Sequence, residues 1–253
     1  MRGLVTQLVL QVSRQARADR IWSVVVAYTL WCAIGVPLAR GLSLGAGSRA
    51  ALDAGLGGLW ALSCGLGIWL GVRAIGLEYA SGRAVVVLSG PVAAHRWVLG
   101  RWLGAAAVLT ACLGAMTAVW LVVGVVLGLQ PSISLAALLL YTWLEGLLLM
   151  TLAALLASRV TALVAALSSV GLWVAGHLSH EYARLMQEWE VGWVATGLFA
   201  VLPDLDRLDV HGLTVRGTLP AGAEIVSNAA YAGLWIAVFA ALLIGSIRTQ
   251  DAA

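Results

Sequence analysis

The sequence contains no lysine, and its positive charge comes from fifteen arginines set against twelve acidic residues. Only 11% of the 253 residues are charged, and the arginines are scattered between apolar runs. This pattern excludes a nucleic-acid-binding surface, which needs clustered basic residues. Without lysine there is also no nucleotide-binding P-loop, whose lysine contacts the phosphates. Because serine-hydrolase and paired-glutamate motifs are missing as well, any catalysis is expected to come from another polypeptide.

Cysteine is scarce, and the positions of the three cysteines do not indicate disulfide bonds. Cys32, Cys64 and Cys112 lie in three different apolar runs and show no CxxC spacing. We therefore predict buried free thiols rather than disulfides or metal ligands. Residues 1–20 lack the compact apolar core and cleavage site of a signal peptide, so membrane insertion is expected to depend on the later apolar runs.

Apolar residues are abundant: 61% of the chain is hydrophobic, and the mean hydropathy is +0.95. These values are typical of a multi-pass membrane protein, and a single helical bundle, residues 1–253, would use the whole chain. At about 1.5 Å per residue, each of six stretches is long enough to cross about 30 Å of hydrocarbon. The predicted spans are 21–40, 55–76, 98–128, 132–157, 160–178 and 225–247. Glycine spacings such as Gly67–Gly71 are too common among the 29 glycines to count as a packing signal.

Residues 1–20 are predicted to form an amphipathic helix at the membrane surface. At 100° per residue, Leu4, Leu8 and Val12 share an apolar face, while Arg14 and Arg17 lie opposite. The alternative is a frayed beginning of the first span.

Arginine bias predicts the orientation of the bundle. With six spans and the N-terminus inside, ten of the fifteen arginines fall in cytoplasmic segments, so both termini are predicted to be cytoplasmic. The 179–224 segment is then the long external piece, with short helices that lie at the outer interface.

Glu145 is the one acidic residue near the middle of a predicted span, 132–157. Carboxylates inside a membrane face the bundle interior or a cavity and suggest a functional site. The alternative is a structural glutamate that holds two helices together. Its candidate partners on neighbouring spans are Tyr28, Thr110, Thr117 and Ser168.

Two polar groups on the predicted outer side resemble metal sites only weakly. His177 and His180 are three residues apart, but no HExxH pattern is present and His211 is only a guessed third ligand. The acidic run 204–209 lacks the glycine and the distal glutamate of a calcium loop. We interpret the histidines as polar residues at the outer end of a helix and the acidic run as an acidic turn, and we predict no metal. The extracytoplasmic candidates remain His177, His180, Asp204, Asp206 and Arg207.

The most polar, turn-rich part of the first two thirds is the 77–97 segment, between the second and third spans. Its charged side chains require a position at a membrane face. Gly82, Gly90 and Pro91 divide it into a helix, a turn and a second helix. Such a loop can be bound by a soluble partner.

This segment resembles the coupling segment of ABC-2-type permeases. The family pattern reads roughly E-x-x-x-G-T-L-E-L-L-L-S-x-P-V followed by L-G-K-x-x-G. This chain departs from it at Arg83, where threonine is usual, and at Val85, where a second glutamate is usual. The matching residues are Glu78, Gly82, Leu88, Ser89, Pro91, Val92, Gly100 and Gly104. Two further stretches, 176–178 and 202–209, are similar to a bacterial branch that includes the nitrous-oxide reductase maturation permeases.

The resemblance implies a type V exporter-like permease fold, an N-terminal interfacial helix plus six transmembrane helices, in the bacterial inner membrane. It implies two permease copies and two cytoplasmic ATPase subunits, with ATP and Mg²⁺ bound in the ATPase and no cofactor in this chain. The implied ATPase contacts are Glu78, Tyr79, Gly82, Arg83, Ser89, Pro91 and Arg96. Glu78 would contact either the ATPase or an arginine of the surface helix, such as Arg14 or Arg17. Lipids surround the spans.

Two other functions remain open at this point. One is a mechanotransmitting ABC complex that acts on an envelope protein through 179–224. The other is a six-span scaffold or proton-linked carrier that uses Glu145, although no inverted repeat with matched broken spans is visible.

Overall fold

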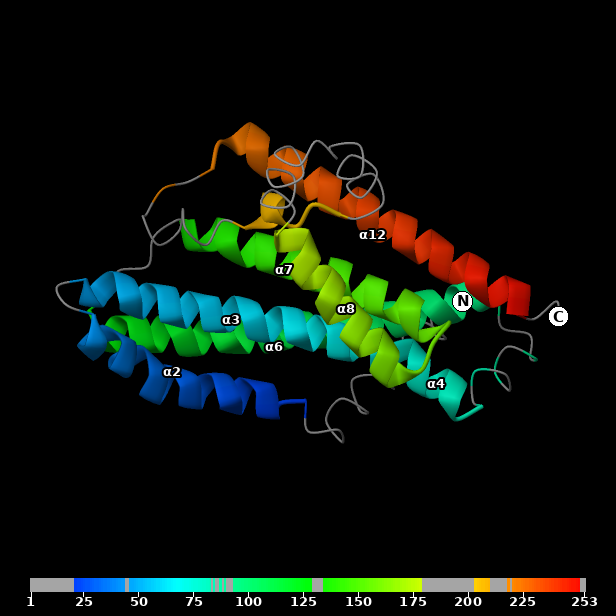
Figure 1. The fold of residues 1–253 in the computed structure, drawn as a ribbon, viewed down its shortest axis with the longest axis horizontal. Helices are drawn as coiled ribbons and strands as arrows, with labels where there is room; N and C mark the ends of the chain where they lie inside the picture. The colour runs from blue at the N-terminus through cyan, green and yellow to red at the C-terminus, as the bar shows by residue number, and fades with distance from the viewer. Residues whose placement is uncertain are drawn as a thin grey trace, which may run out of the picture.

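The computed structural model describes residues 21–43, 46–82, 84, 87, 89, 93–128, 134–178, 203–209, 218 and 220–250. Over these residues the chain is helical, without β-strands, and its long helices run roughly lengthwise (Figure 1). Together with their apolar composition, this makes the chain an all-α, multi-pass membrane protein. The predicted surface helix 1–20 and most of the predicted external segment 179–224 lie outside the described residues.

Among the residues that the structure describes, five apolar helices are long enough to cross a membrane, and they correspond to five predicted spans. Helix α3 continues through a short π-helix, η1 (Val72–Gly76), into α4 (Leu77–Ala80). It also begins well before the predicted residue 55, because a helix can extend past the hydrocarbon where polar residues such as Arg49 and Asp53 are tolerated. The five are α2 (Ser23–Leu42), α3 (Gly47–Gly71), α6 (Ala94–Val126), α7 (Ser134–Ala157) and α12 (Gly222–Gln250).

The fifth predicted span, 160–178, is the shorter helix α8 (Ala162–His177). Its 16 residues cover about 24 Å, whereas a hydrocarbon core is about 30 Å thick. The expectation that each apolar stretch alone is long enough to cross therefore does not hold for α8.

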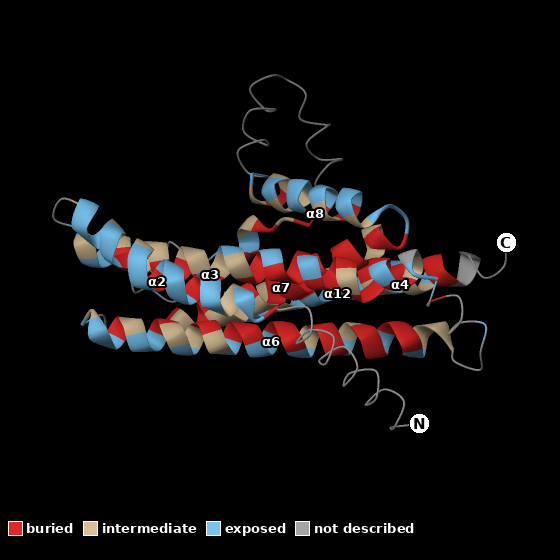
Figure 2. Ribbon diagram, turned by 90° about the horizontal axis from the view of Figure 1, so that it is seen from below, coloured by how far each residue is buried: buried red, intermediate tan, exposed pale blue. Residues whose placement is uncertain are grey.

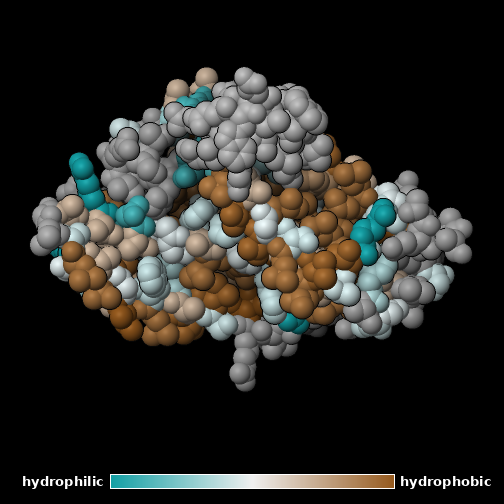
Figure 3. Space-filling view, viewed as in Figure 1, coloured by the Kyte–Doolittle hydropathy of each residue, from teal (hydrophilic) through white to brown (hydrophobic). Residues whose placement is uncertain are grey.

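Helix α7 is the centre of the bundle. In the most apolar 18-residue stretch of α7, 72% of the residues are buried by other parts of the protein. The corresponding shares are 17% for α2 and 28% for α12. Figure 2 shows α2 mostly in the exposed and intermediate colours, and apolar side chains cover much of the described surface in Figure 3. The exposed apolar side chains of the outer helices are therefore expected to face lipid. They include Val26, Ile34, Leu38, Val122, Val125, Leu234 and Leu242.

Helices α3 and α7 pack with their backbones in contact through glycine. A Cβ atom on Gly67 would lie 2.5 Å from the Gly146 carbonyl oxygen, and one on Gly71 would collide with the Met150 carbonyl. The two helices therefore approach each other at Gly67 and Gly71, although the spacing of these glycines is no packing signal in the sequence alone.

The connections alternate between the two ends of the bundle (Figure 1). The α2–α3 turn, the C-terminal end of α6 and the beginning of α12 lie at one end. The turn after α4, the α7–α8 turn and the end of α12 lie at the other. Given the arginine bias, the second end is predicted to be cytoplasmic.

Labelling of two introduced cysteines tests this orientation. Ser48 and Ser81 are exposed at opposite ends of the continuous α3–α4 helix. We expect a membrane-impermeant maleimide to label Ser81→Cys only from the cytoplasmic side and Ser48→Cys only from the outside. The parent protein gives the background, because Cys32, Cys64 and Cys112 are buried. Labelling of both positions from one side would contradict the predicted topology.

Candidate functional site: two buried polar clusters

The 77–97 segment begins as a direct extension of a membrane span. Its first helix, α4, follows η1 without a break, and its second is the beginning of α6 at Ala94. Between them, Gly82 adopts a φ of +70°, where a side chain would be strained, and its backbone N–H donates to the Tyr79 carbonyl. The described ends of the predicted helix–turn–helix therefore belong to two long helices.

The predicted contact residues of this segment differ in exposure. Gly82, Ser89 and Arg96 are exposed. Tyr79 is half-buried, and its ring packs edge-on against Trp97 with centroids 6.3 Å apart. Arg83 and Pro91 lie outside the described residues.

Glu78 is buried instead of facing solvent. Its Oε1 accepts a hydrogen bond from Arg101 Nη2 at 2.9 Å, and the two side chains are 8% and 4% exposed. Arg101 lies on α6, so this ion pair joins α4 to α6 beneath the turn. Arg14 and Arg17, the partners considered from the sequence, lie outside the described residues. The overlooked signal was Arg101 itself, because an arginine one helical turn or more inside a span needs a partner.

Arg101 also contacts the π-helix. Its Nε donates to the Ala74 carbonyl at 2.9 Å. A π-turn interrupts the regular i→i−4 hydrogen bonding of a helix, so carbonyls within it are available to side-chain donors. One guanidinium therefore binds both the carboxylate of Glu78 and the distorted end of α3.

The second cluster surrounds Glu145 in the middle of α7. Glu145 is fully buried, and each of its carboxylate oxygens accepts an indole N–H at 2.7 Å. The donor to Oε2 is Trp60 on α3, and the donor to Oε1 is Trp173 on α8. The buried Cys64 thiol of α3 lies beside Glu145. Glu145 thus links three helices, α3, α7 and α8.

The four partners considered from the sequence do not contact Glu145 in the described structure. The Tyr28 hydroxyl donates to the Gly55 carbonyl, and Thr110 and Thr117 donate to carbonyls of their own helix. Ser168 is exposed. Indole N–H groups were overlooked because a tryptophan in an apolar run is usually counted as apolar, although a buried indole requires an acceptor.

His177 completes this cluster. Its Nε2 lies 3.4 Å from Glu145 Oε1, and its ring packs edge-on against both Trp60 and Trp173. Since His177 is the last residue of α8, the end of this helix lies beside the middle of α7. His180 and His211 lie outside the described residues, and no group that could hold a metal is found in the part of the chain that the structure describes.

The acidic run 203–209 is a packed turn. Leu205 and Leu208 are buried, and the Leu205 N–H donates to the Gly176 carbonyl at the end of α8. Asp204 Oδ2 accepts from Arg207 Nε at 3.1 Å, and the guanidinium lies over the Tyr231 ring on α12. The turn containing Asp206 therefore connects α8 to α12.

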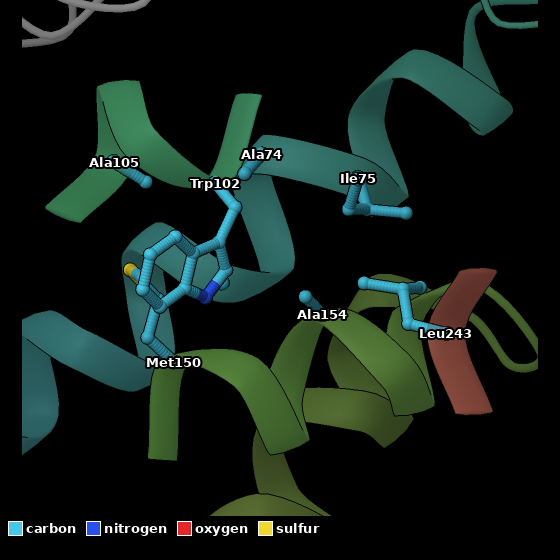
Figure 4. Close-up of a pocket in the computed structure, with 8 residues that line it drawn as sticks. Ala74, Ile75, Trp102, Ala105, Met150, Ala154 and Leu243 are labelled. Carbon is cyan, nitrogen blue, oxygen red and sulfur yellow. The ribbon is translucent and has the colours of Figure 1, made fainter. Parts of the chain in front are cut away.

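A cavity of about 10 Å³ lies where η1, α6, α7 and α12 meet (Figure 4). Trp102 and Leu243 point into it from α6 and α12, and Met150 and Ala154 line it from α7. The volume is about that of a single water, and the lining is apolar. We therefore regard it as a packing gap near the Arg101 contact.

Both polar clusters connect different helices, one at the predicted cytoplasmic end and one in the middle of the bundle. The Glu78–Arg101 cluster lies beneath the turn that resembles a coupling segment, and the Glu145 cluster lies at the end of the short helix α8. Their geometry is the basis for assigning a function, since no protein-family model and no curated protein matches this chain.

Proposed function

We propose that this chain is the non-catalytic, membrane-spanning permease subunit of an ABC transporter in a bacterial inner membrane. It would couple ATP hydrolysis by a separate ATPase subunit to the export or movement of a substrate. The observation that carries the proposal is the 77–97 segment: a turn with the coupling-motif residues Gly82 and Ser89 exposed, held at the ends of two long helices.

The arrangement beneath this turn is suited to transmitting force. Helix α4 is continuous with α3, and the Glu78–Arg101 ion pair fastens it to α6. A push on the turn by an ATPase would therefore move α3 and α6 together. Both helices are long enough to cross the membrane, so the movement would reach the opposite face.

The complex we propose contains two copies of this chain and two ATPase subunits, with ATP and Mg²⁺ in the latter. A second candidate is a mechanotransmitting complex that acts on an extracytoplasmic protein. It is favoured by the 203–209 turn, which is anchored to α8 and α12 through Gly176 and Tyr231. Movement of those helices would carry the adjoining external segment with them.

Substitution of Gly82 by tryptophan tests the proposed ATPase contact. No atom lies within 4 Å of a Cβ built at this glycine, so the added bulk would project from the turn. We expect Gly82→Trp to abolish most of the co-purification with the partner ATPase, or to uncouple ATP turnover from transport. The measurement is ATPase recovery and ATP hydrolysis in nanodiscs, at matched expression.

Gly128→Trp is the matched control. Gly128 also has a φ of +70° and open space around it, but it follows α6 at the opposite end of the bundle. Both variants therefore carry similar backbone strain, roughly 1–2 kcal/mol, and similar bulk. Equal ATPase binding and coupling in the two variants would refute the proposed contact.

A further inference from the structure

The hydrogen bonds of His177 determine which of its ring nitrogens carries a proton. Nδ1 lies 3.1 Å from the Trp173 carbonyl oxygen. A carbonyl can only accept, so Nδ1 is the donor and bears hydrogen. The other nitrogen, Nε2, then faces Glu145 Oε1 at 3.4 Å.

This contact requires a second proton. If Nε2 were bare, its lone pair would point at a carboxylate oxygen inside the bundle, and the two would repel. A proton on Nε2 gives an imidazolium beside a carboxylate, and a proton on Oε1 gives a carboxylic acid beside a neutral imidazole. Either placement makes the pair attractive and neutral overall, so one proton is part of the arrangement.

We propose that Glu145 and His177 form a proton-binding site in the middle of the membrane, and that its proton holds the end of α8 against α3 and α7. The inference concerns a site outside the 77–97 segment and does not depend on the proposed ATPase partner. Glu145 has no exposed surface, whereas the His177 side chain is 16% exposed. Because His177 Nε2 itself is buried, the proton exchanges with water only when the packing around this nitrogen opens.

Loss of this proton leaves a carboxylate beside a neutral imidazole, with a net negative charge in a low-dielectric site. The ionisable groups that interact with Glu145 in the described structure are His177 from α8 and Cys64 from α3, and neither then supplies a positive charge. The two indole donors still bind the carboxylate, but the attraction to His177 is gone. Raising the pH is therefore expected to release the end of α8.

Cys64 provides a native reporter of this release. It is fully buried beside Glu145, so a water-soluble thiol reagent can reach it only when the packing around Glu145 opens. We would compare full-length protein in nanodiscs whose only cysteine is Cys64 with protein whose only cysteine is Cys112. Cys112 is equally buried on α6, so it corrects for the greater intrinsic reactivity of thiols at higher pH.

Between about pH 6 and about pH 9, the ratio of Cys64 to Cys112 reaction rates should rise roughly tenfold. Such a change corresponds to an opening free energy lower by about 1.4 kcal/mol. In a His177→Gln background, whose amide N–H donates at every pH, the ratio should stay constant. A constant ratio in the wild-type background would overturn the proposal, even if the glutamine variant failed to fold. So would an equal rise in both backgrounds.

Discussion

Replacing Glu145 by leucine is expected to be among the most destabilising single changes in the bundle. It leaves the indole N–H groups of Trp60 and Trp173 without their acceptor in a buried site. Each unsatisfied donor costs about 1–3 kcal/mol. We expect a large fall in the thermal unfolding midpoint in nanodiscs and poor recovery of folded protein.

Glu145→Gln separates lost hydrogen bonds from lost volume. Its amide offers one acceptor oxygen where the carboxylate offers two, so one of the indoles loses its partner. The expected order of stability is therefore wild type, then Glu145→Gln, then Glu145→Leu. Adding Trp60→Phe to the leucine variant should recover part of the loss, since it removes one unpaired donor. Wild-type stability of Glu145→Leu would mean that the two hydrogen bonds contribute nothing.

The sequence predicted that Glu145 matters but could not predict its partners. Helix α7 is apolar nearly all round, so hydropathy does not fix which neighbour faces each side. The length of α8 was equally hidden, because residues 160–178 are apolar enough for a full span. The end of α8 lies beside the middle of α7, and this position brings Trp173 to the level of Glu145.

The apolar composition predicted the helical class and the approximate spans. In hydrocarbon the backbone N–H and C=O groups have no water to bond, so they must form hydrogen bonds within helices. The spacing of Gly67 and Gly71 was visible but uninformative, since a sequence rich in glycine contains many such pairs. Which pair is used depends on the rotation of α3 against α7. The Glu78–Arg101 ion pair could not be predicted for a related reason. The two residues lie on different helices, and their contact depends on the turn between those helices.

Removing one partner of the Glu78–Arg101 pair is the second change with a large expected effect. Both side chains are nearly fully buried, so Arg101→Leu leaves the Glu78 carboxylate without this cation and the Ala74 carbonyl without this donor. Breaking a buried ion pair from one side costs roughly 3–5 kcal/mol. We expect the unfolding midpoint of Arg101→Leu to fall accordingly, and that of Glu78→Leu to fall by a comparable amount.

The ion pair between the exposed Arg207 and Asp204 is the matched control. Arg207 is 56% exposed, so its ion pair is hydrated and screened, and Arg207→Leu should cost less than about 1 kcal/mol. If Arg101→Leu and Arg207→Leu were equally mild, the Glu78–Arg101 pair would not be holding α4 to α6.

The double variant Glu78→Leu/Arg101→Leu separates the cost of an isolated buried charge from the loss of the link between α4 and α6. It leaves no isolated charge, so it should be more stable than either single variant, as expected when a buried ion pair is replaced by apolar side chains. It nevertheless lacks the hydrogen-bonded tie between α4 and α6. Under the proposed function, this protein should bind the ATPase normally but hydrolyse ATP without the usual coupling to transport, because movement of the turn no longer carries α6 with it. Full coupling in a stable double variant would show that force passes from the turn to α6 by another route.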